Sequence, residues 1–216
     1  FWLIIEVGNM QRTSSSVFTP ILIAGCGITI ICFAVRSAFG VFQIPIASEF
    51  GWLRYEFSLA LAIQNLAWGI GQPVFGAIGE KMGDRLAILL GAIAYAIGLV
   101  LSSFSSSPIE HQFLQILVGF GVAGTGMGII LAVVGRASSP ENRSMSLSIA
   151  TAAGSIGQMI GPPFAEYLLG SMNWASVFIV FAVLILGSLL FLPIMSAPKV
   201  NENVGSEKSM GEVLSH

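Results

Sequence analysis

The chain has 216 residues, of which only 9% are charged and 55% belong to the hydrophobic set. Soluble globular domains carry about 25% charged residues, so this composition cannot cover a surface that faces water. The net charge of −2 supplies no basic field, which excludes nucleic-acid binding on electrostatic grounds. Both cysteines, Cys26 and Cys32, fall in the first apolar run and are interpreted as small core residues.

Residues 1–17 are interpreted as an amino-terminal segment before the first membrane helix. Met10, followed by Gln-Arg-Thr-Ser-Ser-Ser, looks like a better start than Phe1, so residues 1–9 receive little weight. The apolar run that begins at Val17 is too long for the hydrophobic region of a signal peptide. No A-x-A cleavage site follows it, and we therefore expect no cleaved signal.

Apolar runs of membrane-spanning length recur through residues 18–195, separated by short polar turns. A helix needs about 20 apolar residues to cross the hydrocarbon core of a bilayer. The sequence therefore predicts an all-α polytopic membrane protein with six transmembrane helices. The six runs are Phe18–Ile44, Phe57–Gly79, Leu86–Phe104, Phe113–Val134, Met145–Leu169 and Trp174–Met195.

Orientation follows from the distribution of Lys and Arg, because cytoplasmic loops carry the excess of positive charge. The turns on one side of the predicted bundle, together with both termini, carry nearly all of this charge, and the other side has Arg54 alone. We therefore expect both termini to be cytoplasmic, in a multi-pass protein of the cell (inner) membrane. The residues on the basic side are Arg12, Lys81, Arg85, Arg136, Arg143, Lys199 and Lys208.

Glycines crowd the fourth apolar run, where five of them lie between Gly119 and Gly128. Small residues let helix backbones approach closely in lipid, so this run is expected to pack tightly on its neighbours. Gly119 to Gly124 matches G-x-G-x-x-G, but no strand precedes it and no suitably spaced acidic residue follows. A nucleotide site is therefore not expected, and neither a cofactor nor a metal is predicted.

The turn between the second and third runs carries a recognisable motif. Gly76 is followed after three residues by Glu80-Lys81-Met82-Gly83-Asp84-Arg85. This order resembles the loop signature between helices 2 and 3 of the major facilitator superfamily, with Glu80 where Asp is usual and Asp84 in place of the first closing basic residue. The resemblance implies the amino-terminal half of a secondary transporter, built from two inverted three-helix repeats.

The same resemblance implies a conformational gate at this turn. In the family the acidic residue of the loop bonds to charge at the end of helix 4 and to the start of helix 11, which makes Arg136 the expected partner of Glu80. Charges that only set topology are the alternative for Lys81 and Arg85, although they do not explain the glycine spacing. The gating candidates are Gly76, Glu80, Lys81, Gly83, Arg85 and Arg136.

The fifth run contains Gly157, Gly161 and Pro162, which resemble the Gly-x-x-x-Gly-Pro signature of helix 5 in this family. Pro162 lacks a backbone N–H and is expected to bend the helix, either to shape packing or to assist gating. Ile70-Gly71-Gln72 recurs as Ile156-Gly157-Gln158, in the two runs that inverted repeats would make equivalent.

Arg36 is the strongest candidate for substrate binding, since a charge inside a membrane segment is costly and usually faces a cavity or a partner. Its guanidinium can hold a carboxylate through paired hydrogen bonds. Snorkelling to the outer interface is the alternative. The nearby Phe39-Gly40-Val41-Phe42 resembles helix 1 of the monocarboxylate and oxalate-formate branches, which favours a small organic anion as substrate.

Further polar side chains are predicted at membrane depth, and interhelical packing contacts are the alternative role for each. Gln115 stands where the family commonly has an arginine, and its neutrality argues against a proton-linked role there. Glu166 lies near the outer end of the fifth run, where a solvated carboxylate is the simpler account. With Arg36, the substrate-binding candidates are Gln64, Asn65, Gln115, Thr125 and Gln158; Gln72 is also at membrane depth.

Residues 196–216 are polar and are interpreted as a cytoplasmic linker toward a missing carboxy-terminal six-helix half. Besides that half and the lipid bilayer, the expected partner is a small-molecule substrate, with proton or counter-anion coupling left open. A homo-oligomeric channel or packing subunit is the main alternative. An intramembrane serine protease is disfavoured because His111 and His216 are both expected outside the helices.

Overall fold

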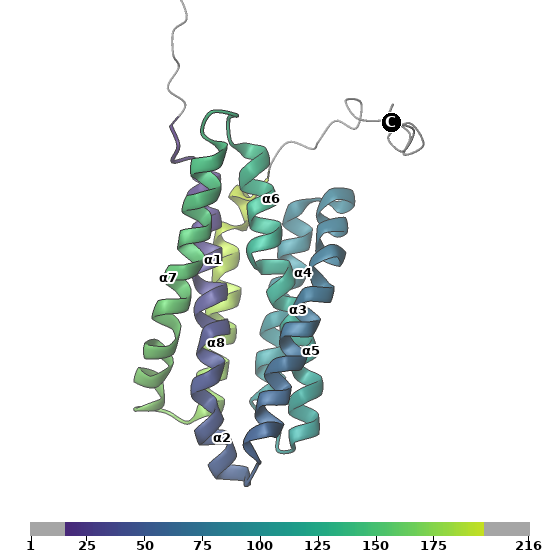
Figure 1. Ribbon diagram of the computed structural model, residues 1–216, viewed down its shortest axis with the longest axis vertical. Helices are drawn as coiled ribbons and strands as arrows, with labels where there is room; N and C mark the ends of the chain where they lie inside the picture. Colours follow the sequence, from purple (N-terminus) through teal and green to yellow (C-terminus); the bar gives the residue numbers. More distant parts are fainter. Residues whose placement is uncertain (1–15, 197–216) are drawn as a thin grey trace, which may run out of the picture.

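The computed structural model describes residues 16–196, which form helices joined by short turns (Figure 1). Within that range there is no β-strand, and the helices make six passes along the long axis of the bundle. The prediction of an all-α fold with six spans is therefore confirmed. The predictions for residues 1–15 and 197–216 lie outside the described residues.

Each of the six passes consists of one or more helical segments. The first pass is α1 (Pro20–Ala38), the short 3-10 helix η2 (Phe39–Phe42) and α2 (Gln43–Phe50). The second and third passes are α3 (Arg54–Met82) and α4 (Asp84–Ser102). The fourth pass is divided into α5 (Pro108–Thr125) and α6 (Met127–Ala137). The fifth is α7 (Arg143–Leu169), and the sixth is α8 (Trp174–Gly187) with the 3-10 helix η3 (Ser188–Ile194).

Several helices extend beyond their apolar runs because capping residues, rather than hydropathy, set their ends. The first pass continues past Ile44 to Phe50 and stops at Gly51, whose φ of 70° is left-handed. The fourth begins at Pro108 instead of Phe113, since Ser107 and Glu110 form a capping box around a proline at the first helical position. Apolar runs thus located the passes but underestimated the length of the first, second, fourth and fifth.

Four of the six passes are long and apolar enough to cross a membrane by length and composition: Pro20–Phe50, Asp84–Ser102, Pro108–Ala137 and Trp174–Ile194. The other two, α3 and α7, have 29 and 27 residues and are long enough but more polar. Each carries a stripe of exposed polar side chains: Ser58, Asn65, Gln72 and Glu80 on α3, and Ser144, Ser148, Thr151, Ser155 and Gln158 on α7.

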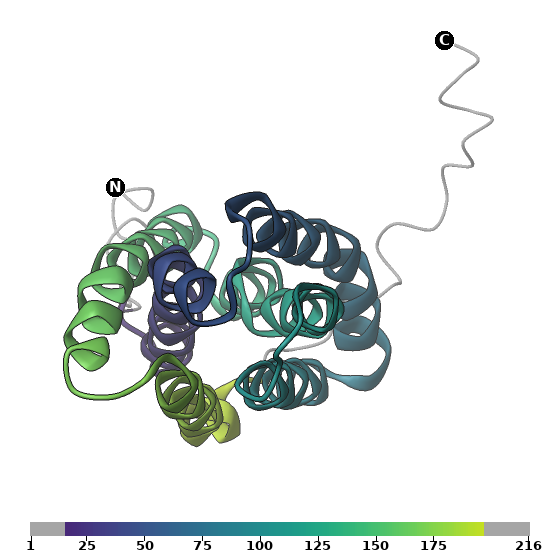
Figure 2. The same ribbon diagram turned by 90° about the horizontal axis from the view of Figure 1, so that it is seen from below.

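The six passes form two groups of three (Figure 2). Seen along the bundle, α1 lies between α7 and α8, and α5 lies between α3 and α4. The second pass of each three-helix repeat thus packs on the first pass of the other, α3 on α5 and α7 on α1, as inverted repeats require. The chain enters α1 and leaves η3 at the same end of the bundle (Figure 1).

Glycines allow the closest helix contacts, and they do so symmetrically. A Cβ atom added at Gly157 or Gly161 of α7 would meet the backbone oxygens of Ile30 and Ala34 on α1. A Cβ at Gly71 of α3 would lie 2.7 Å from the Ala123 side chain on α5. The repeated Ile-Gly-Gln tripeptides therefore occupy equivalent contacts, α3 on α5 and α7 on α1.

We expect Gly161→Ala to destabilise the bundle by about 1–3 kcal/mol, because the new methyl group would push α7 away from α1. Gly69→Ala is the matched control, since nothing lies within 4 Å of its added Cβ. Removing an interior helical glycine there should leave stability unchanged or raise it by about 0.5–1 kcal/mol. Thermal unfolding in detergent measures both, and equal behaviour of the two variants would contradict the packing described.

Candidate functional site

Arg36 lies close to the middle of the 31-residue first pass. The sequence predicts a helix end at Ile44, which would put Arg36 toward the outer end, but the continuation to Phe50 centres it. Its Nη2 donates a hydrogen bond of 2.5 Å to Oδ1 of Asn65 on α3. The guanidinium thus reaches across to another helix at mid-span instead of extending along its own helix toward an interface.

An aromatic surface supports the same guanidinium. The Cζ atom of Arg36 lies 4.4 Å from the centroid of the Trp68 ring, a cation–π contact. Trp68 in turn meets Phe33 of α1 edge-on, with ring centroids 6.0 Å apart. Sequence reasoning missed Trp68, although its position three residues after Asn65 places both side chains on one face of a helix.

The partners of Arg36 are electrically neutral. Asn65 donates its own Nδ2 to the Leu61 carbonyl, so its amide is held in place while its oxygen accepts from Arg36. Every acidic residue among residues 16–196 lies in a turn or within four residues of a helix end. The described half therefore holds a cation at mid-span with no carboxylate beside it.

Two other predicted site residues lie on helices around Arg36. The Oγ1 atom of Thr125 lies 3.2 Å from the Sγ atom of Cys32, which is one helical turn before Arg36. The Thr125 hydroxyl also donates to the Gly121 carbonyl. Gln64 is buried, and its Nε2 has no hydrogen-bond partner. Thr125 thus lines the contact of α1 with α5, whereas Gln64 keeps an unused donor beside Asn65 in the chain.

The fourth pass is interrupted next to Thr125. Gly126 has an extended backbone (φ −86°, ψ −166°) between the end of α5 and the start of α6. A break inside a membrane span frees backbone groups and occurs where protein or a cavity surrounds it. A Cβ on Gly128, in the first turn after the break, would meet Oε1 of Gln72 at 2.6 Å, so α3 covers this point.

The remaining predicted binding residues lie away from Arg36. Gln115 is fully buried beside His111 and Ser102, toward the turn that joins α4 to α5. Gln158 is exposed on α7. His111 was expected outside the helices, but it is buried in the first turn of α5, with Ser105 Oγ 3.1 Å from its Nδ1. The imidazole of this Ser–His pair is surrounded by the rings of Trp52, Phe57 and Phe178.

The charged turn places an ion pair where the motif departs from the family pattern. Arg136, at the end of α6, donates to Asp84 Oδ1 at 2.5 Å. The expectation that Arg136 pairs with Glu80 is wrong in this structure, because Arg136 pairs with Asp84, while Glu80 lies two residues before the end of α3 and is exposed. Asp84 is the first residue of α4, where the helix dipole also favours a carboxylate.

Gly83 makes this geometry possible, since it alone separates α3 from α4 and has a φ of 108°. Side chains other than glycine rarely adopt that conformation. A Cβ at Gly79 would lie 3.4 Å from Asp84 Oδ1, whereas nothing lies within 4 Å of one at Gly76. Of the exposed basic residues, Arg85 donates to the Pro193 carbonyl after α8, and Lys81 lies at the surface.

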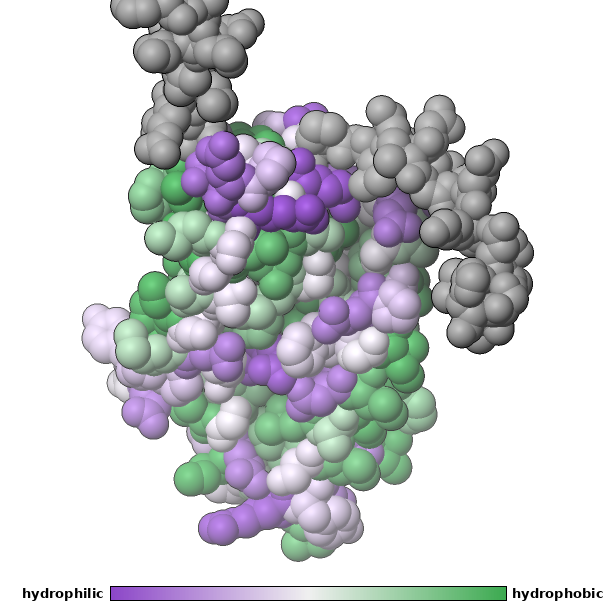
Figure 3. Space-filling model, turned by 45° about the horizontal axis from the view of Figure 1, so that its top comes forward, coloured by the Kyte–Doolittle hydropathy of each residue, from purple (hydrophilic) through white to green (hydrophobic). Residues whose placement is uncertain are grey.

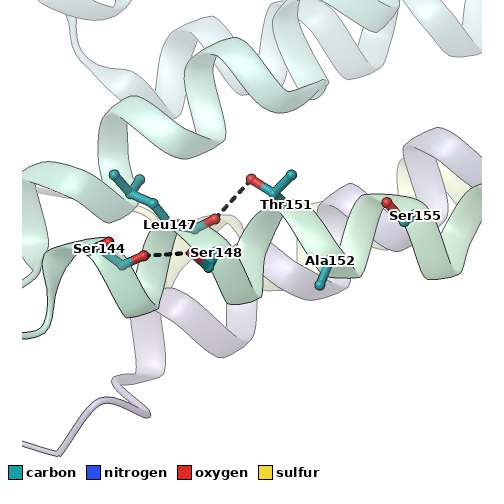
Figure 4. Close-up of a pocket in the computed structure, with 6 residues that line it drawn as sticks. All are labelled: Ser144, Leu147, Ser148, Thr151, Ala152 and Ser155. Atoms are coloured by element: carbon teal, nitrogen blue, oxygen red, sulfur yellow. Dashed lines mark hydrogen bonds between the residues drawn. The ribbon is translucent and has the colours of Figure 1, made fainter.

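The exposed face of α7 is rich in hydroxyl groups and borders a shallow pocket of about 510 Å³ (Figure 4). Ser148 and Thr151 donate back to the carbonyls of Ser144 and Leu147, so these hydroxyls are satisfied within their own helix. Pro162 and Pro163 both lie inside α7, which remains helical through them. Whether Pro162 bends α7 stays a prediction.

These features define a class: a six-helix membrane bundle with a cation at mid-span and an ion pair locking one end. The family comparison agrees, since residues 25–214 match the model of the Major Facilitator Superfamily. The chain belongs to this family. Its membership, together with relatives named as transporters, places it among multi-pass membrane transporters and not among enzymes.

Similar proteins share both sequence and fold. Monocarboxylate transporter 13 of Rattus norvegicus is 26% identical over 165 residues, 71% of this chain and 36% of the relative. The probable L-galactonate transporter of Escherichia coli (strain K12) is 26% identical over 156 residues, 72% of this chain and 34% of the relative. The chain therefore spans about a third of the length of these curated relatives.

A solved structure shows the same fold. The proton:xylose symporter XylE, bound to 6-bromo-6-deoxy-D-glucose, superposes with a TM-score of 0.66 at 18% identity. The match covers 85% of this chain and 45% of the symporter chain. Six helices of this chain thus correspond to somewhat less than half of a complete carrier.

We expect Asp84→Asn and Arg136→Gln each to destabilise the bundle by about 2–3 kcal/mol. Removing one partner of a fully buried ion pair costs about 3–5 kcal/mol, and the expected cost is lower here because Arg136 reaches water. The double variant should cost little more than either single one, giving a coupling free energy of about 2–3 kcal/mol. Thermal unfolding of the parent, the two single variants and the double variant measures this coupling.

Glu80→Gln is the control for this pair, since an exposed substitution usually changes stability by less than about 0.5 kcal/mol. Coupling of Arg136 to Glu80 in the same measurement, with no coupling to Asp84, would contradict the ion pair described here.

Proposed function

We propose that this chain is the amino-terminal half of a secondary active transporter that moves a small organic anion by alternating access. A carboxy-terminal six-helix half completes the carrier, and the substrate binds between the halves. The Arg36 guanidinium is the anion site of this half. We also propose that transport of the anion is coupled to movement of a proton or of a counter-anion.

The observation that carries the proposal is the neutral environment of Arg36. One of its five donors meets Asn65 Oδ1, and the guanidinium stacks on Trp68, so no carboxylate of the described half neutralises it. An unpaired charge at membrane depth is costly, and an incoming carboxylate would offset that cost through paired hydrogen bonds. The site is therefore electrostatically complementary to an anion.

The relatives support the substrate class. Two of them are named for carboxylates, as a monocarboxylate transporter and as a probable L-galactonate transporter. Asn65 and Gln72 offer amide groups that can bind hydroxyl or carbonyl oxygens of such a substrate. Gln64 offers a buried donor without a partner, while Gln115, Thr125 and Gln158 are proposed as supporting polar groups.

The exposed polar faces of α3 and α7 support the proposed second half. Hydrophilic residues reach across the middle of the surface in Figure 3, between hydrophobic regions above and below. Polar side chains in membrane spans face a bundle interior or a water-filled cavity rather than lipid. A second bundle laid against this face would enclose them and form the other wall of the site.

Orientation in the membrane follows from the basic residues. Lys81, Arg85, Arg136 and Arg143 lie at the end of the bundle where the chain enters α1 and leaves η3. We propose that this end is cytoplasmic in the cell membrane, that residues 196–216 link to the second half, and that Glu80 binds that half to close the cytoplasmic side.

We expect Arg36→Gln in the complete carrier to abolish uptake of radiolabelled lactate or L-galactonate, since the site loses its charge and its paired donors. Arg36→Lys should retain weak uptake with a raised KM, because the charge remains without the planar fork. Surface expression and detergent elution profiles show that both variants fold. Unchanged uptake in Arg36→Gln would remove this residue from the site.

Asn65→Asp gives the sharper test, because it places a carboxylate on the guanidinium that the substrate should occupy. We expect the KM for the anion to rise more than in Asn65→Ala, which removes the contact but leaves the site cationic. A lower KM in Asn65→Asp than in Asn65→Ala would contradict an anion site at Arg36.

The purified monomeric chain of 216 residues should not accumulate either anion in liposomes, since the second wall of the site is absent. Uptake by the monomer would overturn the half-carrier proposal. Uptake together with a dimeric mass in native mass spectrometry would instead favour a homo-oligomer, in which a second copy covers the polar faces of α3 and α7.

A further inference from the structure

A second buried polar cluster lies at the end of the bundle opposite the charged turn. His111 is 1% exposed and belongs to the first turn of α5. Its Nδ1 lies 3.1 Å from Ser105 Oγ, and its Nε2 lies 3.3 Å from Gln115 Nε2. The Ser105 hydroxyl also donates to the Ser102 carbonyl at 2.8 Å. His111 and Ser105 are not among the groups proposed for the Arg36 site.

The cluster contains an acceptor that the neutral ring does not use. Gln115 is completely buried, and its Oε1 has no hydrogen-bond partner. A half-turn of the amide brings Oε1 to the place of Nε2, opposite His111 Nε2, where it accepts an N–H of the ring. Buried acceptors without partners are rare and costly, so this one indicates a second state of the cluster.

Aromatic rings surround the imidazole. Phe57 and Phe178 are nearly parallel to it, with centroids 5.7 and 6.3 Å away, and Trp52 is tilted at 5.5 Å. Burial disfavours the charged imidazolium, whereas the faces of aromatic rings attract a cation. Burial and the aromatic rings thus act on the imidazolium in opposite directions, which allows the ring both to bind a proton and to release it.

A pocket of about 430 Å³ leads to this cluster from the surface. Ser105 and the exposed carboxylate of Glu110 both line it, together with apolar side chains of α4 and α5. Ser105 is itself 5% exposed, and its Oγ lies 3.1 Å from His111 Nδ1, so this residue borders both the pocket and the ring. The chain of groups runs from Glu110 and the pocket to Ser105, His111 and Gln115.

Other charged groups at this end are held elsewhere. Glu49 of α2 accepts from Trp174 Nε1, and Glu56 of α3 caps its own helix through the Leu53 N–H. Arg54 at the start of α3 is exposed. From α4 the cluster receives Ser102, and α8 has no ionisable side chain between Trp174 and Gly187. His111 is therefore the group in this cluster that can take up a proton.

We propose that His111 is a proton-binding site of the carrier, loaded through Ser105 from the pocket that Glu110 borders. As the structure has the cluster, Gln115 Nε2 faces His111 Nε2 and the Ser105 hydrogen goes to the Ser102 carbonyl, which puts the ring hydrogen on Nδ1. In the other neutral tautomer the Gln115 amide is turned so that Oε1 accepts from Nε2–H, and Ser105 donates to Nδ1 instead of to Ser102. A proton reaching Ser105 Oγ lets that hydroxyl pass its own hydrogen to Nδ1. The imidazolium then donates from Nδ1 to Ser105 and from Nε2 to Gln115 Oε1, and release reverses these steps.

The test follows His111 directly and needs no substrate, so its result is separate from that of the anion site. Trp52 is the reporter, because a protonated imidazole in contact with an indole quenches its fluorescence. The full-length carrier is titrated with acid in lipid nanodiscs, and the difference between the parent and Trp52→Phe isolates the signal of Trp52. We expect reversible quenching that is lost in His111→Gln and kept in His216→Gln.

Two further measurements make the result decisive. Histidine ring ¹⁵N spectra of the parent and Trp52→Phe should show the same protonation step, which covers the case in which His111→Gln does not fold. After a rapid pH drop, quenching should develop more slowly in Ser105→Ala than in Ser106→Ala, whose exposed hydroxyl is the control. Absence of quenching before the carrier unfolds, quenching that persists in His111→Gln, or equal rates in the two serine variants would overturn the proposal.

Discussion

The guanidinium of Arg36 imposes the central constraint on this six-helix bundle. A charge at the middle of a membrane span is tolerated only with hydrogen-bond partners and shielding from lipid. The fold supplies both from α3, where Asn65 gives an oxygen and Trp68 gives an aromatic face. Because both partners are neutral, the shielded site remains positively charged, and its chemistry follows from that charge.

The fold holds this site by bringing helix backbones unusually close. Gly157 and Gly161 let α7 lie directly on α1, and Gly71 lets α3 lie on α5. α1 in turn contacts α5 where Cys32 Sγ lies 3.2 Å from Thr125 Oγ1, so α5 lies between α1 and the helix α3 to which Arg36 reaches. At the charged turn, a single left-handed glycine joins α3 to α4 and puts Asp84 against Arg136. Glycine placement thus determines both the mid-span site and the locked end.

Hydropathy was sufficient to predict the six passes and the helical class. Hydropathy and charge could not predict helix ends such as Phe50 and Pro108, which depend on local caps, or the pairing of Arg136 with Asp84. Pairing depends on where a chain turns, and Gly83 redirects it one residue before Asp84. Trp68 was missed because an aromatic residue in an apolar run carries no distinct signal, whereas Asn65 does.

The interlocked glycines also limit how this half can change shape. Carbonyl groups of α1 occupy the space that side chains at the glycine positions of α7 would fill. Neither helix can therefore slide or rotate past the other without a steric clash. The same holds for α3 and α5. Within each of these pairs the two helices can therefore change position only together, so a change of shape has to occur between the pairs and not inside them.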